Sequence, residues 1–123
     1  MTEQGAVVVD GCEIRWSARG AGAPELVLVH GGAAHRAWWE PVLGALGDRQ
    51  RVVTVDLSGH GDSGRRERYA METWADELEA VIAAATSGRA VIVGHSFGGR
   101  VGAVTAARHP ERVQALVLVD SAV

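Results

Sequence analysis

The chain has 123 residues, of which 47% are hydrophobic and 22% are charged, and its formal net charge is −3. This length suits a single α/β domain over residues 1–123, and the scattered charge excludes a basic surface for nucleic acid or acidic lipid. The longest apolar runs are too short to cross a membrane, and Met1–Gln4 lacks the features of a secretory signal. The only cysteine, Cys12, excludes an intrachain disulfide and a thiolate metal site, so we expect a cytoplasmic protein.

The chain opens with a predicted β-hairpin. Val7–Val9 and Cys12–Ser17 flank Asp10-Gly11, a dipeptide that is favoured in two-residue hairpin turns. Apolar and polar residues alternate along the second strand, which is typical of an antiparallel strand with one face in water. We expect Cys12 to be a buried thiol in this strand.

Four nearly continuous apolar runs then predict strands that are covered on both faces, as in a parallel sheet. They are Leu26–Val29, Val52–Val55, Ala90–Val93 and Ala115–Val119. Three predicted helices lie between them: about Ala37–Gly47, then Met71–Ala85, and a third that starts near Phe97 and ends before Pro110. The pattern predicts an α/β fold with a mostly parallel sheet, an N-terminal antiparallel hairpin and helices on both sides.

The third apolar run leads into Gly94-His95-Ser96-Phe97-Gly98, after which small residues open a helix. The sequence G-x-S-x-G between a strand and a helix predicts a sharp turn that exposes the serine hydroxyl above the sheet. We call residues 94–98 the elbow. Gly94 and Gly98 suit this turn because side chains there would collide with the neighbouring strand and helix. Ser96 is therefore the first candidate for a nucleophile.

The last predicted strand, Gln114–Asp120, has the sequence of a central strand, but no later segment can pair with it or cover it. A long apolar edge favours pairing with another chain. We therefore expect a fragment or one part of a larger assembly, which self-associates or binds a missing C-terminal half along this strand.

Three motifs give the chain its resemblance to the N-terminal half of an α/β-hydrolase-fold protein. They are Val29–Gly32, Asp56–Ser63 and Gly94–Gly99, each at the end of an apolar strand and in the order and spacing of that family. The resemblance covers nearly the whole chain. It implies three helices and a sheet of strand order 1-2-4-3-5-6, to which the family normally adds strands 7 and 8 that these 123 residues lack. It also implies a small-molecule substrate, no metal and no organic cofactor.

The resemblance assigns roles to particular residues. It implies Ser96 as the nucleophile, and the backbone N–H groups of Phe97 and Gly32 as the two donors of an oxyanion hole. None of the five histidines follows the seventh and eighth strands, where the family places its general base. Most members carry the acid after the seventh strand and a minority after the sixth, so Asp120 stays open as the acid or as a packing or turn residue.

Two further residues are candidates for contact with a substrate. His35 lies just past the expected oxyanion loop, and Trp38 opens the first predicted helix near the expected pocket. A surface position for His35 and core packing for Trp38 are the alternatives. His95 neighbours Ser96, but successive side chains leave a strand end in different directions, so we expect His95 to pack rather than to take the serine proton.

The sequence thus favours a serine hydrolase, or its N-terminal portion, that acts on a small ester-like substrate. A serine in the elbow argues against the family branches that form an alkyl-enzyme ester on an aspartate, such as haloalkane dehalogenases. Two alternatives stay open. One is a catalytically silent fragment or interaction module with the same half-fold, and the other is a lyase of the hydroxynitrile type.

Overall fold

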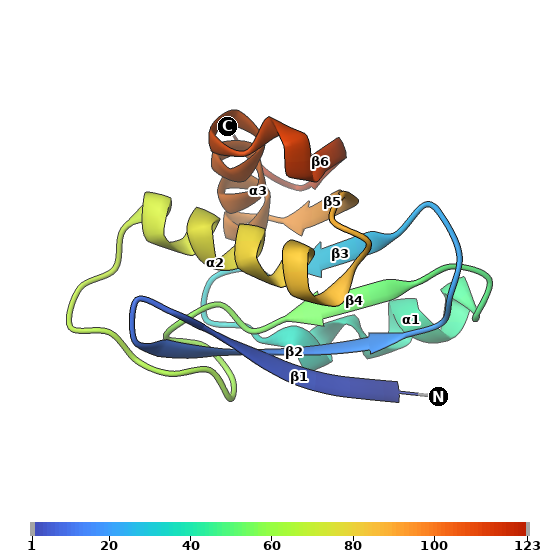
Figure 1. Ribbon diagram of the computed structural model, residues 1–123, viewed down its shortest axis with the longest axis horizontal. Coiled ribbons are helices and arrows are strands. Elements are labelled where there is room, and N and C mark those ends of the chain that lie inside the picture. The colour runs from blue at the N-terminus through green and yellow to red at the C-terminus, as the bar shows by residue number, and fades with distance from the viewer. Residues whose placement is uncertain (1, 123) are drawn as a thin grey trace.

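A six-stranded mixed sheet forms the centre of the molecule (Figure 1). The structure is a computed structural model that describes residues 2–122. The strands are β1 (Thr2–Val9), β2 (Cys12–Arg19), β3 (Leu26–Val29), β4 (Val52–Val55), β5 (Ala90–His95) and β6 (Val113–Val119). Their order across the sheet is β1-β2-β4-β3-β5-β6, as predicted. β2 runs antiparallel to its neighbours β1 and β4, and the four strands from β4 to β6 in this order are parallel.

β1 and β2 form the predicted hairpin. Asp10 and Gly11 at its tip have φ angles of 47° and 76°, as both central residues of a type I′ turn require. β1 starts at Thr2 and β2 continues to Arg19, so both strands are longer than predicted. These extra residues are strands because their backbones pair, as between Thr2 and Arg19. Cys12 is a buried thiol at the start of β2, as predicted.

Three α-helices lie within residues 2–122: α1 (Glu40–Leu46), α2 (Met71–Ala85) and α3 (Phe97–Arg108). α2 has the predicted bounds, whereas the segment predicted as one helix from Ala37 begins with a 3-10 turn, η1 (Arg36–Trp39). Pro41 lies in the first turn of α1, where the N–H that proline lacks would have no acceptor within the helix. A second 3-10 turn, η2 (Pro110–Arg112), leads from α3 into β6.

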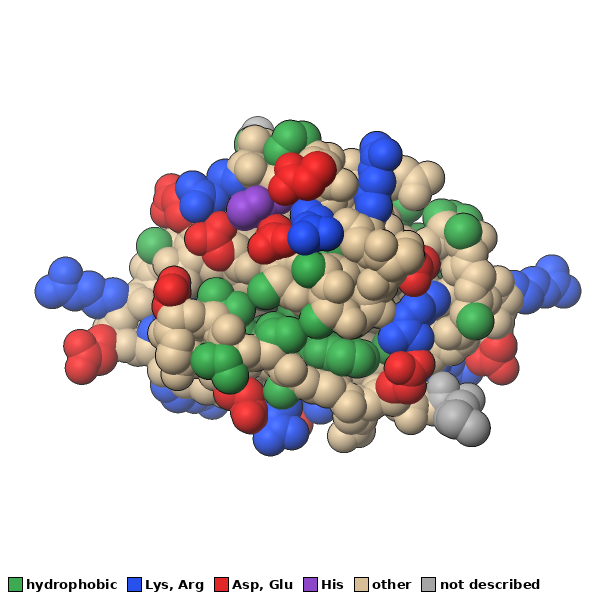
Figure 2. All heavy atoms as spheres, in the orientation of Figure 1, with side chains coloured by type: hydrophobic (Ala, Val, Ile, Leu, Met, Phe, Trp, Pro, Cys, Tyr) green, Lys and Arg blue, Asp and Glu red, His purple; other side chains and the backbone are tan. Residues whose placement is uncertain are grey.

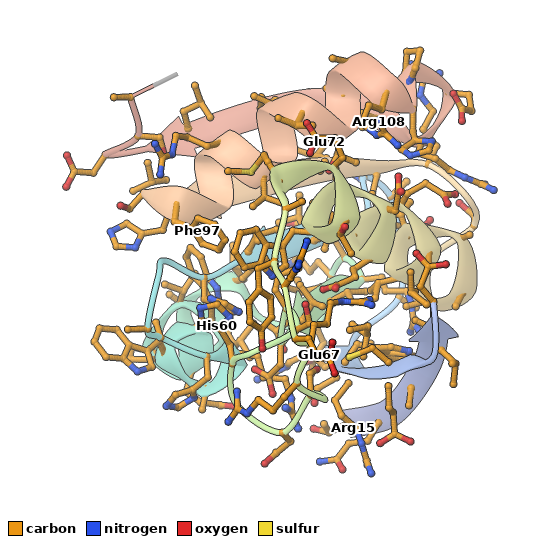
Figure 3. All side chains as sticks on the ribbon, turned by 90° about the vertical axis from the view of Figure 1, so that its left-hand side faces the viewer. Arg15, His60, Glu67, Glu72, Phe97 and Arg108 are labelled. Atoms are coloured by element: carbon orange, nitrogen blue, oxygen red, sulfur yellow. The ribbon has the colours of Figure 1, made fainter. Side chains whose placement is uncertain are left out.

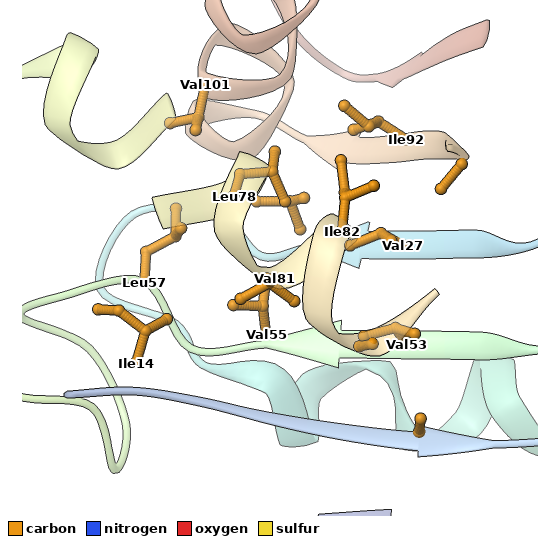
Figure 4. Packing of buried hydrophobic residues seen from close by; sticks show 14 of the residues in the cluster. Ile14, Val27, Val53, Val55, Leu57, Leu78, Val81, Ile82, Ile92 and Val101 are labelled. Atoms are coloured by element: carbon orange, nitrogen blue, oxygen red, sulfur yellow. The ribbon is translucent and has the colours of Figure 1, made fainter. Parts of the chain in front are cut away.

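The larger of the two apolar clusters lies between the sheet and the helices α2 and α3 (Figure 4). Leu78 and Ile82 of α2 are fully buried in this cluster with Val27 and Val53 of the sheet. Leu78 and Ile82 are four residues apart, so both project from the same face of α2.

A smaller apolar cluster lies on the opposite face of the sheet. Leu28, Leu43 and Val52 form it and bring α1 against β3 and β4. Because Val27 and Leu28 are successive strand residues, they project to opposite faces and belong to different clusters. β3 and β4 are therefore buried on both faces, as their continuous apolar sequences predicted.

The surface carries charges of both signs. On the face seen in Figure 2, acidic and basic side chains are interspersed rather than separated into large patches. Among residues 2–122, no helix has both the length and the apolar character needed to span a membrane.

β6 lies at one edge of the sheet formed by residues 2–122, although its sequence is typical of a central strand. It pairs with β5 on one side, and the side chains of Val117, Leu118 and Val119 are 45%, 39% and 41% exposed. Its other side, within the described part of the chain, therefore presents backbone hydrogen-bonding groups beside exposed apolar side chains.

Candidate active site

Ser96 lies in the sharp turn between β5 and α3. Its φ of 52° and ψ of −118° are a combination that residues other than glycine rarely adopt, at a cost of about 1–3 kcal/mol. A side chain on Gly98 would overlap the carbonyl oxygens of Val29 and His30, and one on Gly94 would collide with the backbone of α3. The glycines of the elbow therefore allow the close packing that keeps the serine in this turn.

Hydrogen bonds fix the backbone on both sides of Ser96. Its N–H donates to the carbonyl of Val119 at the end of β6 (2.9 Å), and its carbonyl accepts from the N–H of Gly99 (2.9 Å). The hydroxyl of Ser121 also donates to the Ser96 carbonyl (2.9 Å). The Ser96 side chain forms no capping hydrogen bond with α3. Its hydroxyl is thus available at the N-terminus of that helix.

The two residues predicted to supply the oxyanion hole, Gly32 and Phe97, lie close to each other. Gly32 follows β3 in a turn closed by a hydrogen bond from the N–H of Ala34 to the carbonyl of Gly31 (3.2 Å). A Cβ atom on Gly32 would lie 3.8 Å from the Cβ atom of Phe97. Phe97 begins α3, and the first N–H groups of a helix have no acceptor within it and attract negative charge. The structure thus brings Gly32 next to Phe97, which follows Ser96 directly.

His30 fixes the loop that contains Gly32. Its Nε2 atom accepts a hydrogen bond from the N–H of Leu57 (3.1 Å), so Nδ1 carries the proton and donates to the carbonyl of Gly31 (2.7 Å). Burial of the ring lowers the pKa of His30 to about 4, although the bond to Gly31 acts in the opposite direction. The imidazole is therefore neutral at pH 7 and connects two turns of the site.

Aromatic rings pack around Phe97 at the start of α3. The rings of His60 and Phe97 are stacked with their centroids 5.8 Å apart (Figure 3). Trp74 of α2 meets Phe97 edge to face at 4.8 Å, and the His60 ring lies 4.7 Å from that of His30. This cluster connects the loop between β4 and α2 with the elbow and with the loop after β3.

A cavity of about 300 Å³, which we call the apolar cavity, opens beside Ser96. It is lined by His30, Gly31, Gly32, Ala34, Trp38, Trp39, Val42, His95, Ser96 and Val119. Trp38 thus lies at the same cavity as Ser96, and its contact with a substrate stays a prediction. Sequence reasoning missed Val42, although Val42 follows Trp38 by four residues, a spacing that places both on one face of a helix.

His35 lies on the other side of η1, at a second cavity of about 400 Å³ that we call the polar cavity. The guanidinium of Arg36 at this cavity pairs with Asp56 and Asp62, and its Nε donates to the hydroxyl of Ser17 (3.0 Å). The imidazole of His35 meets the edge of the Trp38 ring, with centroids 6.4 Å apart. His35 is therefore not among the residues that line the apolar cavity.

Within residues 2–122, no imidazole forms a hydrogen bond with the Ser96 hydroxyl. His95 packs against the loop after β3, where a Cβ atom on Gly31 would lie 3.0 Å from its Nδ1 atom. Asp120 follows β6 in an exposed bend with a φ of 53°. Sequence reasoning missed Ser121, whose one signal is its position two residues after the end of β6, the strand that pairs with β5.

Comparison with known proteins identifies the family. A family model described as "alpha/beta hydrolase fold" matches residues 24–123, and the chain belongs to this family. The match extends from the start of β3 through the elbow to β6, and so includes all three motifs.

Individual relatives show the same relationship. The chain is 41% identical over 108 residues to a 2-hydroxymuconate semialdehyde hydrolase of Pseudomonas sp., a match that covers 84% of this chain and 38% of that protein. It is 41% identical over 107 residues to a 1-acylglycerol-3-phosphate O-acyltransferase of Arabidopsis thaliana, with 82% and 26% covered. The crystal structure of a bacterial membrane phospholipase A is similar with a TM-score of 0.88 and 36% identity, with 98% and 40% covered. The chain thus spans less than half the length of these proteins.

Proposed function

We propose that this chain supplies the nucleophile and the oxyanion hole of a serine hydrolase that acts on a small ester-like substrate. The observation that carries the proposal is the backbone of Ser96, which has a φ of 52° that glycine would adopt at lower cost. A strained residue beside a cavity supports a role in chemistry rather than in packing. The hydrolase among the relatives supports the same reaction class.

In the proposed reaction the Ser96 oxygen attacks the ester carbonyl carbon while its proton moves to a general base. The carbonyl oxygen becomes negative and accepts hydrogen bonds from the N–H groups of Phe97 and Gly32, each of which typically lowers the barrier by about 3–4 kcal/mol. The bond to the alcohol then breaks, and the alcohol leaves with the proton held by the base. Water attacks the acyl-enzyme by the same steps and releases the acid and the free serine.

We propose that the base is an imidazole from outside residues 2–122. Both ring nitrogens of His30 are already engaged in hydrogen bonds, and His95 packs against Gly31. Asp120 is the proposed acid, because it follows β6 directly after Val119, whose carbonyl binds the Ser96 N–H. Loss of the base from a serine hydrolase lowers turnover by on the order of 10⁶-fold. The described residues alone are therefore expected to be nearly silent as a catalyst.

A fluorophosphonate, which reacts with activated serines, tests the proposed nucleophile. We expect slow labelling of the purified chain at Ser96, accelerated by added imidazole because imidazole can replace the missing base. Ser96→Ala should abolish this labelling. Ser87→Ala, a change at an exposed serine after α2, is the matched control and should leave it intact. Mass spectrometry of the labelled peptides gives the rate at each serine.

Two results would contradict the proposal in different ways. Equal labelling of Ser96 and Ser87, with and without imidazole, would refute Ser96 as the nucleophile. Rapid labelling of Ser96 without imidazole would mean that a base acts from within the chain, and would refute the base from outside.

Two broader expectations belong to the same proposal. Residues 1–123 form one domain, which is supported by the single sheet that runs from β1 to β6 between the two apolar clusters. The protein acts in the cytoplasm, which is supported by the free, buried thiol of Cys12.

A further inference from the structure

The 3-10 turn η1 separates two cavities of opposite character. His35 and Arg36 line the polar cavity, whereas Trp38 and Trp39 line the apolar cavity beside Ser96. A single short turn thus presents charge on one side and aromatic rings on the other. Trp38 and Trp39, on the side of the turn next to Ser96, therefore influence which chemical groups of a substrate the apolar cavity can bind.

The apolar cavity offers apolar surface without a carboxylate, ammonium or guanidinium group among the described residues that line it. Trp38 and Val42 in its lining are 66% and 40% exposed. No Asp, Glu, Lys or Arg occurs among the residues from 2 to 122 that line it. His30 in the same lining stays neutral, because burial lowers its pKa to about 4. A charged group held among these side chains would lose much of its hydration without gaining an ion pair with an Asp, Glu, Lys or Arg of the lining.

Arg36 is the arginine nearest in sequence to Trp38 and Trp39 of the apolar cavity, and its hydrogen-bond donors are already engaged. Its Nε bonds to Ser17, and its two terminal nitrogens pair with Asp56 and Asp62. Asp56 is fully buried and also accepts the backbone N–H groups of Arg36 and Asp62. Turning Arg36 toward the apolar cavity would leave the buried Asp56 carboxylate without its cation, which is strongly unfavourable. A substrate carboxylate therefore gains no ion pair from this turn.

The apolar cavity, of about 300 Å³, has room for a short chain or a small ring of a substrate. A chain or ring of that size can cover the exposed face of Trp38 and remove its apolar surface from water.

We infer that the substrate group bound in the apolar cavity is an uncharged, apolar chain or ring, and that Trp38 is its main contact. The inference rests on the proposed function, because it takes Ser96 as the residue that reacts with the neighbouring carbonyl. It makes the site selective for neutral esters over esters whose bound chain ends in a carboxylate. The bound group is either the acyl or the alcohol side of the ester.

Binding of unreactive amides tests this selectivity without requiring catalysis. The neutral probes are N-methylhexanamide, with its chain on the acyl side, and N-hexylacetamide, with its chain on the other side. Each is compared with an analogue whose chain ends in a carboxylate, by NMR titration of the full chain observed at the amides of Gly31 and Gly32 and the indole of Trp38. We expect the neutral member of at least one pair to bind about tenfold more tightly or better. The pair whose neutral member binds more tightly shows whether the cavity holds the acyl side or the alcohol side of the ester.

Substitutions of residues that line the apolar cavity test the role of Trp38 directly. Trp38→Ala should weaken binding of the neutral probe about tenfold, and Trp38→Phe should keep most of it because an aromatic face remains. Val42→Arg should shift the preference toward the carboxylate, since it places a cation in the wall. Val8→Arg, at a 71% exposed position of β1 outside the cavity, is the matched control and should leave the preference unchanged.

The inference and the proposed function fail in different experiments. Equal binding of neutral and charged probes in both pairs, or selective binding that survives Trp38→Ala, would overturn the inference even when the fluorophosphonate labels Ser96. Selective binding that Trp38→Ala removes would uphold the inference, and absence of fluorophosphonate labelling in the same protein would refute only the proposed reaction.

Discussion

Polar side chains near Ser96 bind partners that are distant in the sequence. His30 accepts a hydrogen bond from Leu57, 27 residues further on, and Arg36 pairs with Asp56, 20 residues further on. The three motifs predicted which turns would meet, because each follows a strand of one parallel sheet and the carboxyl ends of such strands lie at one edge. They did not predict the partner of each polar group, because that depends on contacts between turns that no local pattern records.

The buried imidazole of His30 should make stability depend on pH. Its pKa is about 4 in the folded protein, against an ordinary value of 6.5, so the unfolded chain takes up the proton first as pH falls. The stability that neutral His30 contributes is therefore fully present above about pH 6.5 and is lost progressively down to about pH 4, by about 3 kcal/mol. Urea denaturation at several pH values measures this loss.

Substitution of His30 isolates its share of that pH dependence. His30→Gln should flatten the change in unfolding free energy between about pH 6.5 and pH 4. His35→Gln is the control, because His35 lies at the polar cavity rather than between the two turns. The same slope in wild type and His30→Gln would show that the imidazole is not the group responsible.

At the scale of helices and strands, elements with a strong internal pattern were predictable and those formed by outside contacts were not. β3, β4 and α2 have their predicted bounds because each carries its own apolar pattern. The first half of β1 is a strand because it pairs with β2. η1 was missed because the carboxylate of Asp56 accepts the N–H of Arg36 (2.7 Å), a bond from another loop to the first residue of the turn.

The loop between β4 and α2 is fastened to α2 by Glu77. This fully buried carboxylate accepts hydrogen bonds from the N–H and hydroxyl of Ser58 (2.8 and 2.5 Å) and from Nε of Arg66 (2.9 Å). Glu77→Ala should lower the free energy of unfolding by about 3–5 kcal/mol, because it leaves the Arg66 cation without its partner. Chemical denaturation provides the measurement.

A double substitution separates the ion pair from other effects of the change. Glu77→Ala with Arg66→Ala should cost clearly less than the sum of the two single changes, because each single change already breaks the same pair. Glu79→Ala, which breaks the partly exposed pair with Arg112, is the matched control and should cost about 1 kcal/mol or less. Strict additivity of the Glu77 and Arg66 changes would contradict the assigned contact.

At the scale of the whole molecule, β6 is an edge strand whose outer side pairs with no other strand among the described residues. Edge strands with exposed apolar side chains tend to pair with further strands. The valines and leucine at the end of β6 are about two-fifths exposed in the part of the chain that the structure describes. The order of the strands in the sheet was predictable from the motifs. The strand that pairs with the free edge of β6 was not, because the apolar sequence of a strand does not specify which segment pairs with it.

We propose that the chain self-associates along β6 when no other segment occupies this edge. Sedimentation velocity at increasing concentration should show a dimer or larger species. Val117→Lys should shift the population toward monomer, since a charge on an edge strand opposes pairing. Val8→Lys, on the opposite edge strand β1, is the control and should not. A monomer at every concentration would refute self-association, and competition by a polypeptide that supplies further strands would identify the alternative occupant.

One hydrogen bond joins the edge strand β6 to Ser96, the proposed nucleophile. The N–H of Ser96 donates to the carbonyl of Val119, and Val119 belongs both to the end of β6 and to the lining of the apolar cavity. A strand that docks along β6 would therefore hold in place the peptide that carries the proposed nucleophile and the side of the apolar cavity beside it. The degree of association along β6 and the reactivity of Ser96 would then increase together, so that a change in either could be detected by measuring the other.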